Sequence, residues 1–311
     1  MEFLKQAVVA ALNQTYENIE VLIGDDGSSS AIRAWCEQQA KAHHRFRYQR
    51  NPRNLGLAGN WNALVDSARG DYISIIGDDD RLLPEFVDKT VEVADRGATL
   101  IFTDHFVIDE NGNRLRERTT ALSREYGRDS MSAGWVPDAE ICAWRNTIPI
   151  CATLVRTADI RRLRFKEDLN NPELELFVRL ARENSRFYFL PDFLSEYRVH
   201  SGSETIKTGL KSDRLMDYLI PILVRPEVES TKAAYVAPLM VNAVSRCLLD
   251  GDRARARRFL KSHYYPNAQR LRPRGIVQAM CAFIPKIIGQ ATYRAFWKIK
   301  NGPKKILNFI R

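Results

Sequence analysis

The sequence predicts an α/β fold in which two strands end in acidic turns. Residues 71–76 form an apolar run rich in β-branched side chains, which is typical of a buried strand, and three carboxylates at 78–80 follow it. Pro84 then opens a helix. Residues 20–23 form an earlier apolar strand that runs into the acidic turn 24–30. Because ligands of open α/β sheets bind beyond the carboxyl ends of the strands, both turns are candidate binding sites.

The second acidic turn is a candidate metal site. Adjacent like charges raise one another's pKa unless a cation or a water shell compensates them. Oxygen-only ligands suit Mg²⁺ or Mn²⁺, which bind through one or two carboxylates together with substrate phosphates and keep several waters. A solvated acidic turn is the alternative interpretation of the same residues.

A turn-rich segment lies between the two acidic turns. Residues 51–62 contain Arg53 among several Gly and Asn residues and lead into a helix that ends near residues 68–70. Two strand ends that carry acids, with a basic turn between them, can enclose a nucleotide diphosphate. One acid can take base or ribose groups, Arg53 the phosphates, and the second acid the metal.

At these residues the chain resembles the family 2 glycosyltransferases, which have the GT-A fold with a Rossmann-like, mostly parallel sheet flanked by helices. The resemblance covers roughly residues 1–205. It rests on ordered landmarks at 3–21 (first helix and second strand), Asp25-Asp26-Gly27-Ser28, Arg53-Asn54-Leu55-Gly56, Gly70-Asp71-Tyr72-Ile73, Asp78-Asp79-Asp80, the acidic helix start 173–181 and the Tyr-Arg-x-His turn 197–203. Their order carries the resemblance more than any one motif does.

The resemblance implies a site for a nucleotide-diphosphate sugar and for Mg²⁺ or Mn²⁺. It places the metal on Asp79 and Asp80 and the catalytic base, which takes the acceptor's proton, at Glu173. The donor-binding residues that it implies are Asp25, Asp26, Arg53, Asn54, Gly56, Asp78 and His200. His200 is expected to contact the metal or the diphosphate, or to gate the acceptor; a hydrogen-bonded turn histidine is the alternative.

The chain departs from the family pattern in three places. Relatives begin with an extra strand before the helix that here starts near Phe3, and a sheet without that central strand would leave neighbouring edges unpaired. A truncated or misassigned start, or a compensating feature elsewhere in the protein, are the alternative explanations. Pro172-Glu173 stands where many relatives have Glu-Asp, and glutamate reaches one methylene further. Gly77 stands where many relatives carry the first Asp of the metal motif.

The composition is that of a soluble enzyme. With 311 residues, 45% of them hydrophobic, the chain can build one substantial core and a smaller appendage. The five cysteines are scattered without CxxC spacing, which argues against a disulfide framework or a zinc site and for a reducing compartment. No apolar run approaches the roughly 20 residues of a spanning helix, and no signal peptide is evident.

The C-terminal part of the chain is strongly basic. Residues 251–311 contain 15 Lys and Arg and one acid, a net charge of +14, which leaves −5 for residues 1–250. We expect a glycosyltransferase domain at 1–205 and a basic helical region at 206–311. Its basic, aromatic-bearing stretch 276–309 suits an anionic membrane surface. Ordinary solvated helices are the alternative, and nucleic acid is not expected because no recognised binding motif accompanies the charge.

The sequence therefore predicts an inverting, metal-dependent glycosyltransferase, acting in cell-surface polysaccharide or glycolipid synthesis. Its expected partners are a nucleotide sugar donor and a glycan or lipid-linked acceptor. Its expected location is the cytoplasm, peripheral on the inner face of the membrane. A sugar nucleotidyltransferase, or a catalytically inactive sugar-nucleotide-binding or membrane scaffold protein, are the alternatives. The donor base and sugar and the acceptor's identity are not encoded in these motifs.

Overall fold

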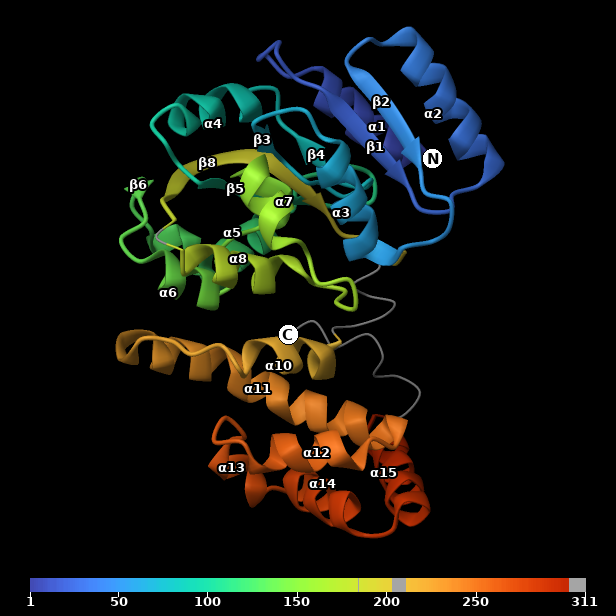
Figure 1. The fold of residues 1–311 in the computed structure, drawn as a ribbon, viewed down its shortest axis with the longest axis vertical. Coiled ribbons are helices and arrows are strands. Elements are labelled where there is room, and N and C mark those ends of the chain that lie inside the picture. The colour runs from blue at the N-terminus through green and yellow to red at the C-terminus, as the bar shows by residue number, and fades with distance from the viewer. Residues whose placement is uncertain (184, 203–210, 302–311) are drawn as a thin grey trace. The chain divides into compact units, whose positions relative to one another are not determined.

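The computed structural model describes residues 1–183, 185–202 and 211–301. The chain divides into two compact units, Met1–His200 and Ser201–Arg311 (Figure 1). The predicted domain boundary at 205/206, Ser203 of the closing turn and the basic residues Lys304 and Lys305 lie outside the described residues.

The first unit begins with a small α/β layer. Its elements are α1 (Glu2–Leu12), β1 (Val21–Asp25), α2 (Ser30–Ala42), β2 (Phe46–Arg50) and α3 (Gly56–Ser67). β1 and β2 form a parallel two-stranded sheet in which Val21 opposes Phe46 and Asp25 opposes Arg50. Leu4 and Val8 of α1 and Cys36 of α2 pack against this sheet. The apolar faces of the two helices therefore share one core with the apolar side chains of the strands.

A six-stranded sheet forms the rest of this unit. Its strands lie in the order β3-β7-β5-β8-β4, and β6 pairs with β8. The elements are β3 (Tyr72–Ile73), β4 (Arg81–Leu82), α4 (Phe86–Ala94), β5 (Leu100–Ile108), α5 (Arg116–Glu125), β6 (Gly134–Trp135), α6 (Ala139–Trp144), β7 (Thr153–Arg156), α7 (Thr157–Leu163), α8 (Glu173–Ala181) and β8 (Phe187–Arg198).

The predicted α/β class is confirmed, but the sheet is mixed rather than mostly parallel. β5 pairs with β8 in parallel, whereas β3 with β7, β5 with β7, β4 with β8 and β6 with β8 pair antiparallel. An apolar strand pattern reports burial on both faces and not the direction of the neighbouring strand, so the sequence could not reveal these reversals.

The predicted strand 71–76 is shorter than expected. Only Tyr72 and Ile73 pair with β7, opposite Arg156 and Val155. The following apolar residues are held by packing instead: Ile75 is 8% exposed and Ile76 packs against the core around Phe86. The apolar run therefore marks a buried segment, only part of which is a strand.

Strand register brings the second acidic turn to the carboxyl end of β8. β4 follows this turn directly and runs antiparallel to β8, with Arg81 opposite Glu196 and Leu82 opposite Ser195. Residues just before β4 therefore lie beside residues just after position 196. The pairing joins segments that are more than 110 positions apart in the chain.

The second unit is helical. Its described helices are α10 (Ser212–Leu219), α11 (Pro226–Asp250), α12 (Arg253–Lys261), α13 (Asn267–Arg270), α14 (Pro273–Phe283) and α15 (Lys286–Asn301). Gly251 ends α11 with φ of +78°, a left-handed conformation that glycine adopts at low cost, and Asp252 accepts a hydrogen bond from Arg255 N as the cap of α12. Within the described residues, no helix is long and apolar enough to cross a membrane.

Gln14 ties the end of α1 to the start of α4 and to the residue Leu83 before it. Its amide nitrogen donates to Leu83 O at 2.9 Å, and its amide oxygen accepts from Val87 N at 3.0 Å. Gln14 is 6% exposed, so these backbone groups have little access to water as a substitute partner.

Replacing Gln14 by alanine should therefore lower the free energy of unfolding by about 2 kcal/mol, because two partly buried backbone groups lose their partners. Urea denaturation followed by circular dichroism measures the loss. Gln38→Ala, on the exposed side of α2, is the control and should change the value by less than about 0.5 kcal/mol. Equal losses in the two variants would contradict this account of Gln14.

Candidate functional site

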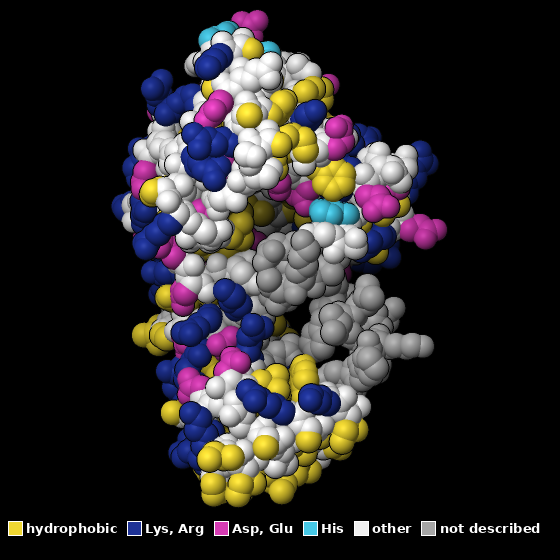
Figure 2. Space-filling model, turned by 90° about the vertical axis from the view of Figure 1, so that its right-hand side faces the viewer, with side chains coloured by type: hydrophobic (Ala, Val, Ile, Leu, Met, Phe, Trp, Pro, Cys, Tyr) yellow, Lys and Arg dark blue, Asp and Glu magenta, His cyan; other side chains and the backbone are white. Residues whose placement is uncertain are grey.

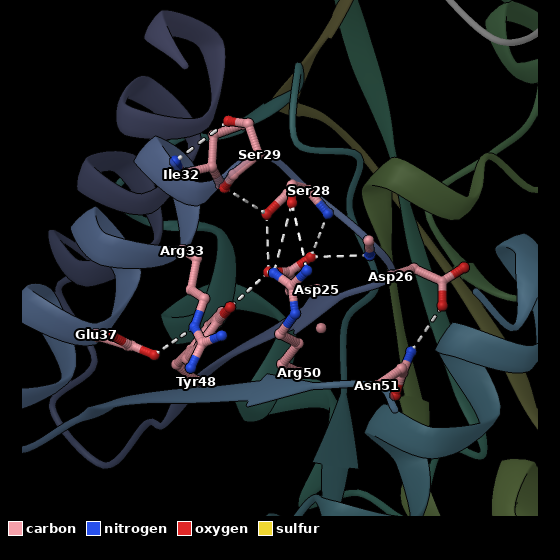
Figure 3. A network of polar contacts seen from close by, with 12 residues as sticks. Asp25, Asp26, Ser28, Ser29, Ile32, Arg33, Glu37, Tyr48, Arg50 and Asn51 are labelled. Carbon is pink, nitrogen blue, oxygen red and sulfur yellow. Dashed lines mark hydrogen bonds and ion pairs between the residues drawn. The ribbon is translucent and has the colours of Figure 1, made fainter. Parts of the chain in front are cut away.

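Asp25 organises the first acidic turn. It lies at the end of β1 and is 5% exposed (Figure 3). The backbone N–H groups of Gly27 and Ser28 donate to its Oδ1 at 3.0 and 2.7 Å. Ser28 Oγ, the Tyr48 hydroxyl and Arg50 Nη1 donate to its Oδ2 at 2.8, 2.5 and 2.8 Å. Both oxygens of Asp25 are therefore engaged within the protein.

These contacts fix the ionisation state of Asp25. Burial alone would raise the pKa of its carboxyl, but hydrogen bonds from Tyr48, Ser28 and Gly27 outweigh burial and hold that pKa well below its usual range. Asp25 is consequently a fixed negative charge that shapes the turn.

Asp26 joins the first acidic turn to the start of α3. Its Oδ1 accepts from Asn51 Nδ2 at 2.9 Å and from Leu55 N at 2.7 Å, and its Oδ2 accepts from Gly56 N at 2.8 Å. Asn54 Nδ2 donates to its backbone oxygen at 2.8 Å. A carboxylate at a helix N-terminus satisfies free N–H groups and interacts favourably with the helix dipole. Asp26 thereby holds the turn 51–55 against the end of β1.

The turn that Asp26 holds presents Arg53 to solvent. The Arg53 side chain is exposed. Gly56 follows with φ of +75°, a backbone conformation that residues other than glycine rarely adopt. In this conformation the backbone N–H of Gly56 reaches Asp26. The geometry leaves the Arg53 guanidinium exposed beside the first acidic turn.

Arg198 holds the second acidic turn at the end of β8. It is 1% exposed. Its backbone N–H donates to Asp80 Oδ1 at 2.9 Å and its Nε donates to Asp79 O at 2.8 Å. Its Nη1 donates to Asp109 O at 3.1 Å, and its Nη2 donates to Gln6 Oε1 at 2.8 Å. One buried guanidinium thus connects the acidic turn, the turn after β5 and α1.

Asp79 and His200 face each other at this turn. Their side chains meet at Oδ2 and Nε2, 3.0 Å apart. The imidazole of His200 packs edge-on against the Phe3 ring at 5.0 Å, and the guanidinium of Arg198 lies 4.5 Å above the same ring. Phe3 of α1 therefore orients both residues.

The neighbouring carboxyls are short of positive charge. Burial, together with the adjacent Asp79, raises the pKa of Asp80 to about 7. Solvent reaches the Asp78 side chain, but the surrounding protein removes part of its hydration and, with Asp79, raises its pKa as well. A divalent cation at this turn would favour the ionised forms of both groups.

Gly77 makes room for the Asp79 carboxylate. A Cβ at position 77 would overlap Asp79 Oδ1. Any side chain there would therefore displace Asp79 from its place beside His200. Within the described residues no group of three or more His, Cys, Asp or Glu is arranged to hold a metal.

Glu173 is a second, separate candidate centre. It is the first residue of α8, and its Oε1 accepts from Asn171 Nδ2 at 2.9 Å. Its Oε2 is shielded from solvent and has no hydrogen-bond partner among the described residues. Burial raises the pKa of Glu173 to about 7. A carboxyl with one free oxygen and a pKa near neutrality can exchange a proton at physiological pH.

Glu175, two positions along α8, has a structural environment instead. It is 2% exposed and forms an ion pair with Arg179 at 2.6 Å. Arg179 in turn donates to Leu163 O at 2.8 Å. This pair ties α8 to the end of α7, whereas Glu173 keeps one oxygen without a hydrogen-bond partner among the described residues.

Comparison with known proteins identifies the family. Residues 2–145 match the family described as Glycosyl transferase family 2. This part of the chain belongs to family 2 of the glycosyltransferases. An uncharacterized glycosyltransferase of Methanocaldococcus jannaschii is 22% identical over 227 residues, covering 70% of this chain and 72% of that protein. The GalNAc(5)-diNAcBac-PP-undecaprenol beta-1,3-glucosyltransferase of Campylobacter jejuni is 24% identical over 221 residues, covering 70% of this chain and 66% of that protein.

Solved structures show that this glycosyltransferase has the GT-A fold predicted from its motifs. S. aureus TarS 1-349 in complex with UDP-GlcNAc has a TM-score of 0.63 at 14% identity, with 96% of this chain and 88% of that chain covered. The mannosyltransferase PcManGT from Pyrobaculum calidifontis, in complex with GDP-Man and Mn²⁺, has a TM-score of 0.56 at 15% identity, with 96% and 83% covered. At these identities the likeness concerns the fold.

The fold of this glycosyltransferase collects most of the predicted site residues into two groups. The first acidic turn holds Asp25, Asp26, Asn54 and Gly56 together, with Arg53 on the same turn, and the second holds Asp78, Asp79, Asp80 and His200. No hydrogen bond or ion pair joins Glu173 to either group within the part of the chain that the structure describes. The binding and catalytic roles of the residues in these two groups and of Glu173 stay predictions.

Sequence reasoning missed the residues that support these groups. Tyr48 and Arg50 lie on β2, and the pairing of β2 with β1 places them beside Asp25. The sequence alone does not indicate this pairing. Gln6 and Phe3 lie on α1 and act through Arg198 and His200. The signal for Arg198 was present: a charged side chain at the end of a long apolar strand needs buried partners.

Asp25→Asn should destabilise the glycosyltransferase by about 2–3 kcal/mol at pH 7, because Tyr48, Ser28 and Arg50 lose a charged acceptor and Arg50 remains partly solvated. The lowered pKa of Asp25 fixes the pH dependence. Its contribution is present above the pKa of the unfolded group, near 4, and is lost as the pH falls further.

Denaturant unfolding at pH 7 and at pH 3 tests this prediction, and the difference from wild type should be smaller at pH 3. Asp71→Asn, an exposed acid before β3, is the control and should shift stability by less than about 0.5 kcal/mol. A difference that grows on acidification would be incompatible with a lowered pKa.

Proposed function

We propose that this glycosyltransferase is an inverting, metal-dependent enzyme that moves a sugar from a nucleotide-diphosphate donor to an acceptor hydroxyl. The observation that carries the proposal is the contact between Asp79 and His200, at the strand end where the second acidic turn lies. A carboxylate and an imidazole side by side, next to two carboxyls with raised pKa values, form a place that favours a cation.

The residues fit a divalent metal ion. Asp79 and His200 offer one oxygen and one nitrogen ligand, and Mg²⁺ or Mn²⁺ accepts few protein ligands when diphosphate and water supply the rest. Asp80 is less suited than Asp79, since it is 4% exposed and its Oδ1 accepts from Arg198 N. We assign Asp79 and His200 as ligands, with Asp80 and Asp78 supplying further negative charge. When bound, the metal neutralises charge on the departing diphosphate.

The donor nucleotide is proposed to lie at the first acidic turn. Asp25 and Asp26, with Asn54 and Gly56, shape a rigid wall for the base and ribose. Arg53 is exposed at the adjacent turn, where its guanidinium can pair with phosphate oxygens. The donor would thus be held by its nucleotide at one turn and by its diphosphate at the other.

Glu173 is proposed as the general base. Its Oε2 takes the proton from the acceptor hydroxyl while that oxygen attacks the anomeric carbon from the face opposite the diphosphate. The bond from the anomeric carbon to the diphosphate oxygen breaks as the new glycosidic bond forms, so the configuration inverts. A pKa of about 7 makes Glu173 a stronger base than an exposed glutamate while leaving it largely ionised above neutrality.

The acceptor is proposed to be a glycan or a lipid-linked glycan of cell-surface polysaccharide or glycolipid synthesis, met at the cytoplasmic face of the membrane. The Campylobacter relative, whose name specifies GalNAc(5)-diNAcBac-PP-undecaprenol, supports this class of acceptor. Neighbours bound to UDP-GlcNAc and to GDP-Man support a nucleoside-diphosphate donor.

Asp79→Ala should abolish Mn²⁺-dependent donor binding and leave the fold intact, because the side chain is partly exposed and, among the described residues, its hydrogen bond is to His200. Titration calorimetry with UDP- and GDP-sugars, with Mn²⁺ or with chelator, measures the affinity. Asp71→Asn, an exposed acid outside the turn, should bind as wild type does. Unchanged affinity in Asp79→Ala would remove the metal assignment.

Glu173→Gln should lower turnover by about 10²–10⁴-fold with donor affinity nearly unchanged. The product to follow is the nucleoside diphosphate; release of pyrophosphate instead would indicate a nucleotidyltransferase. Asp168→Asn, on the exposed part of the preceding loop, is the matched control and should keep most activity. A larger loss in Asp168→Asn than in Glu173→Gln would place the base elsewhere.

The raised pKa of Glu173 also predicts two pH effects. Turnover of the wild type should rise with pH and level off above about 7, since the base acts when ionised, and the small residual turnover of Glu173→Gln should lack this step. The free energy of unfolding of the wild type should fall as the pH rises, whereas its turnover rises. Because the folded pKa exceeds the unfolded value, the wild type loses stability as pH rises from about 4.5 through 7. Glu173→Gln should therefore melt higher than wild type at pH 8 but not at pH 4.

A further inference from the structure

Helices α14 and α15 of the second unit expose a continuous set of large apolar side chains. On α14, Ile276, Met280 and Phe283 recur at helical spacing and are 47%, 60% and 58% exposed. On α15, Ile287 and Ile288 are 84% and 56% exposed in its first turn, next to the end of α14. Figure 2 shows hydrophobic side chains gathered at the lower end of the view, where α14 and α15 lie in Figure 1. We name Ile276, Met280, Phe283, Ile287 and Ile288 the apolar face.

The opposite sides of these helices are anchored in the unit's core. Tyr293 of α15 is fully buried, and its hydroxyl contacts Ser245 Oγ of α11 at 2.5 Å. Gln278 of α14 is fully buried and donates to Val241 O at 2.8 Å. Gln290 Nε2 donates to Leu249 O at 2.8 Å, at the end of α11. The apolar face is therefore directed outward by fixed contacts of the buried face and is not an unsettled part of the core.

The segment that carries the apolar face is basic, and the nearest acids around Lys286 are Asp250 and Asp252 at the junction of α11 and α12. Residues 265–299 contain no Asp or Glu. Arg270, Arg272, Lys286 and Lys298 are exposed in this segment, and Lys286 is the first residue of α15, between Phe283 and Ile287 in the sequence. Long cationic side chains beside exposed aliphatic and aromatic ones are the pattern of surfaces that lie in the headgroup region of an anionic bilayer.

We propose that the apolar face enters the headgroup and acyl boundary of an anionic phospholipid leaflet, with Arg270, Arg272, Lys286 and Lys298 pairing with lipid phosphates around it. A second copy of this chain is a poorer occupant, because apposed apolar faces would bring like charges together with no carboxylate in 265–299 to offset them. A nucleic acid would pair with the cations and leave the isoleucines in water. Lipid satisfies both features.

This surface gives the proposed transferase a place to meet a lipid-linked acceptor. That consequence rests on the proposed function, whereas membrane binding itself does not require donor, metal or turnover. Its test can therefore succeed or fail independently of the catalytic assignment, and the inactive Glu173→Gln variant should bind vesicles as wild type does.

Flotation of the full chain with vesicles tests the proposal. Wild type should float with vesicles rich in phosphatidylglycerol and much less with phosphatidylcholine vesicles. Phe283→Ser with Ile287→Ser should lower the partition coefficient by about tenfold or more and remove the part that resists salt. Leu223→Ser, at an 83% exposed leucine outside the apolar face, is the matched control and should float normally.

The charge contribution has its own matched pair. Arg272→Gln with Lys286→Gln should lower partition to anionic vesicles by about 20- to 30-fold, since each cation near such a surface contributes about a fivefold factor. Arg116→Gln with Arg118→Gln removes two exposed cations from α5 of the first unit and should have little effect. Circular dichroism should show that all four variants are folded. Equal losses in both pairs would indicate non-specific attraction and overturn the proposal.

Site-specific labelling reports insertion directly. All five native cysteines are buried, so a cysteine introduced at Ile287 can be labelled selectively with an environment-sensitive fluorophore. Its emission should shift to the blue on addition of anionic vesicles, whereas a label at Leu223→Cys should not respond. A shift that depends on protein concentration and not on vesicles would identify the apolar face as a contact between copies and overturn the membrane assignment. Absence of flotation at low salt would overturn it as well.

Discussion

The site depends on one buried arginine. Arg198 holds the second acidic turn through its own backbone N–H and through its side chain, and the same guanidinium reaches the turn after β5 and Gln6 of α1. The β4–β8 register makes this possible by placing position 79 beside position 198. Without these contacts three adjacent carboxylates would repel one another into solvent. With them, Asp79 is held in contact with His200.

Environment gives each acid of the chain a different character. Asp25 is buried among five donors and keeps its charge, whereas Asp80 is buried beside another carboxylate, and Glu173 has one shielded oxygen without a partner among the described residues. The surroundings of Asp25 stabilise its carboxylate, whereas those of Asp80 and Glu173 destabilise the ionised form. A rigid anionic turn, a turn that favours a cation and a carboxyl with a raised pKa are the three components on which the proposed metal-assisted sugar transfer rests. The fold separates them although the sequence presents them as similar Asp and Glu residues.

The sequence revealed which residues would gather but not the contacts that gather them. The strand-end positions of Asp25 and Asp26 followed from an apolar run, and the helix beginning at Glu173 was also anticipated. The antiparallel pairings, the short β3 and the role of Arg198 were not, because apolar patterns do not encode strand direction or partners more than 100 positions away. Gly77 shows the same limit: only the structure reveals that a side chain there would displace Asp79.

The central claim is that Asp79 and His200 together hold the metal that accompanies the donor diphosphate. Pulsed electron paramagnetic resonance of Mn²⁺ bound to the protein with a nucleoside diphosphate tests it most directly, because a directly bound imidazole gives a nitrogen coupling that oxygen ligands lack. The account predicts this coupling in wild type, its loss in His200→Gln, and loss of bound Mn²⁺ in Asp79→Ala. Tight Mn²⁺ binding without nitrogen coupling, or a coupling that persists in His200→Gln, would contradict it.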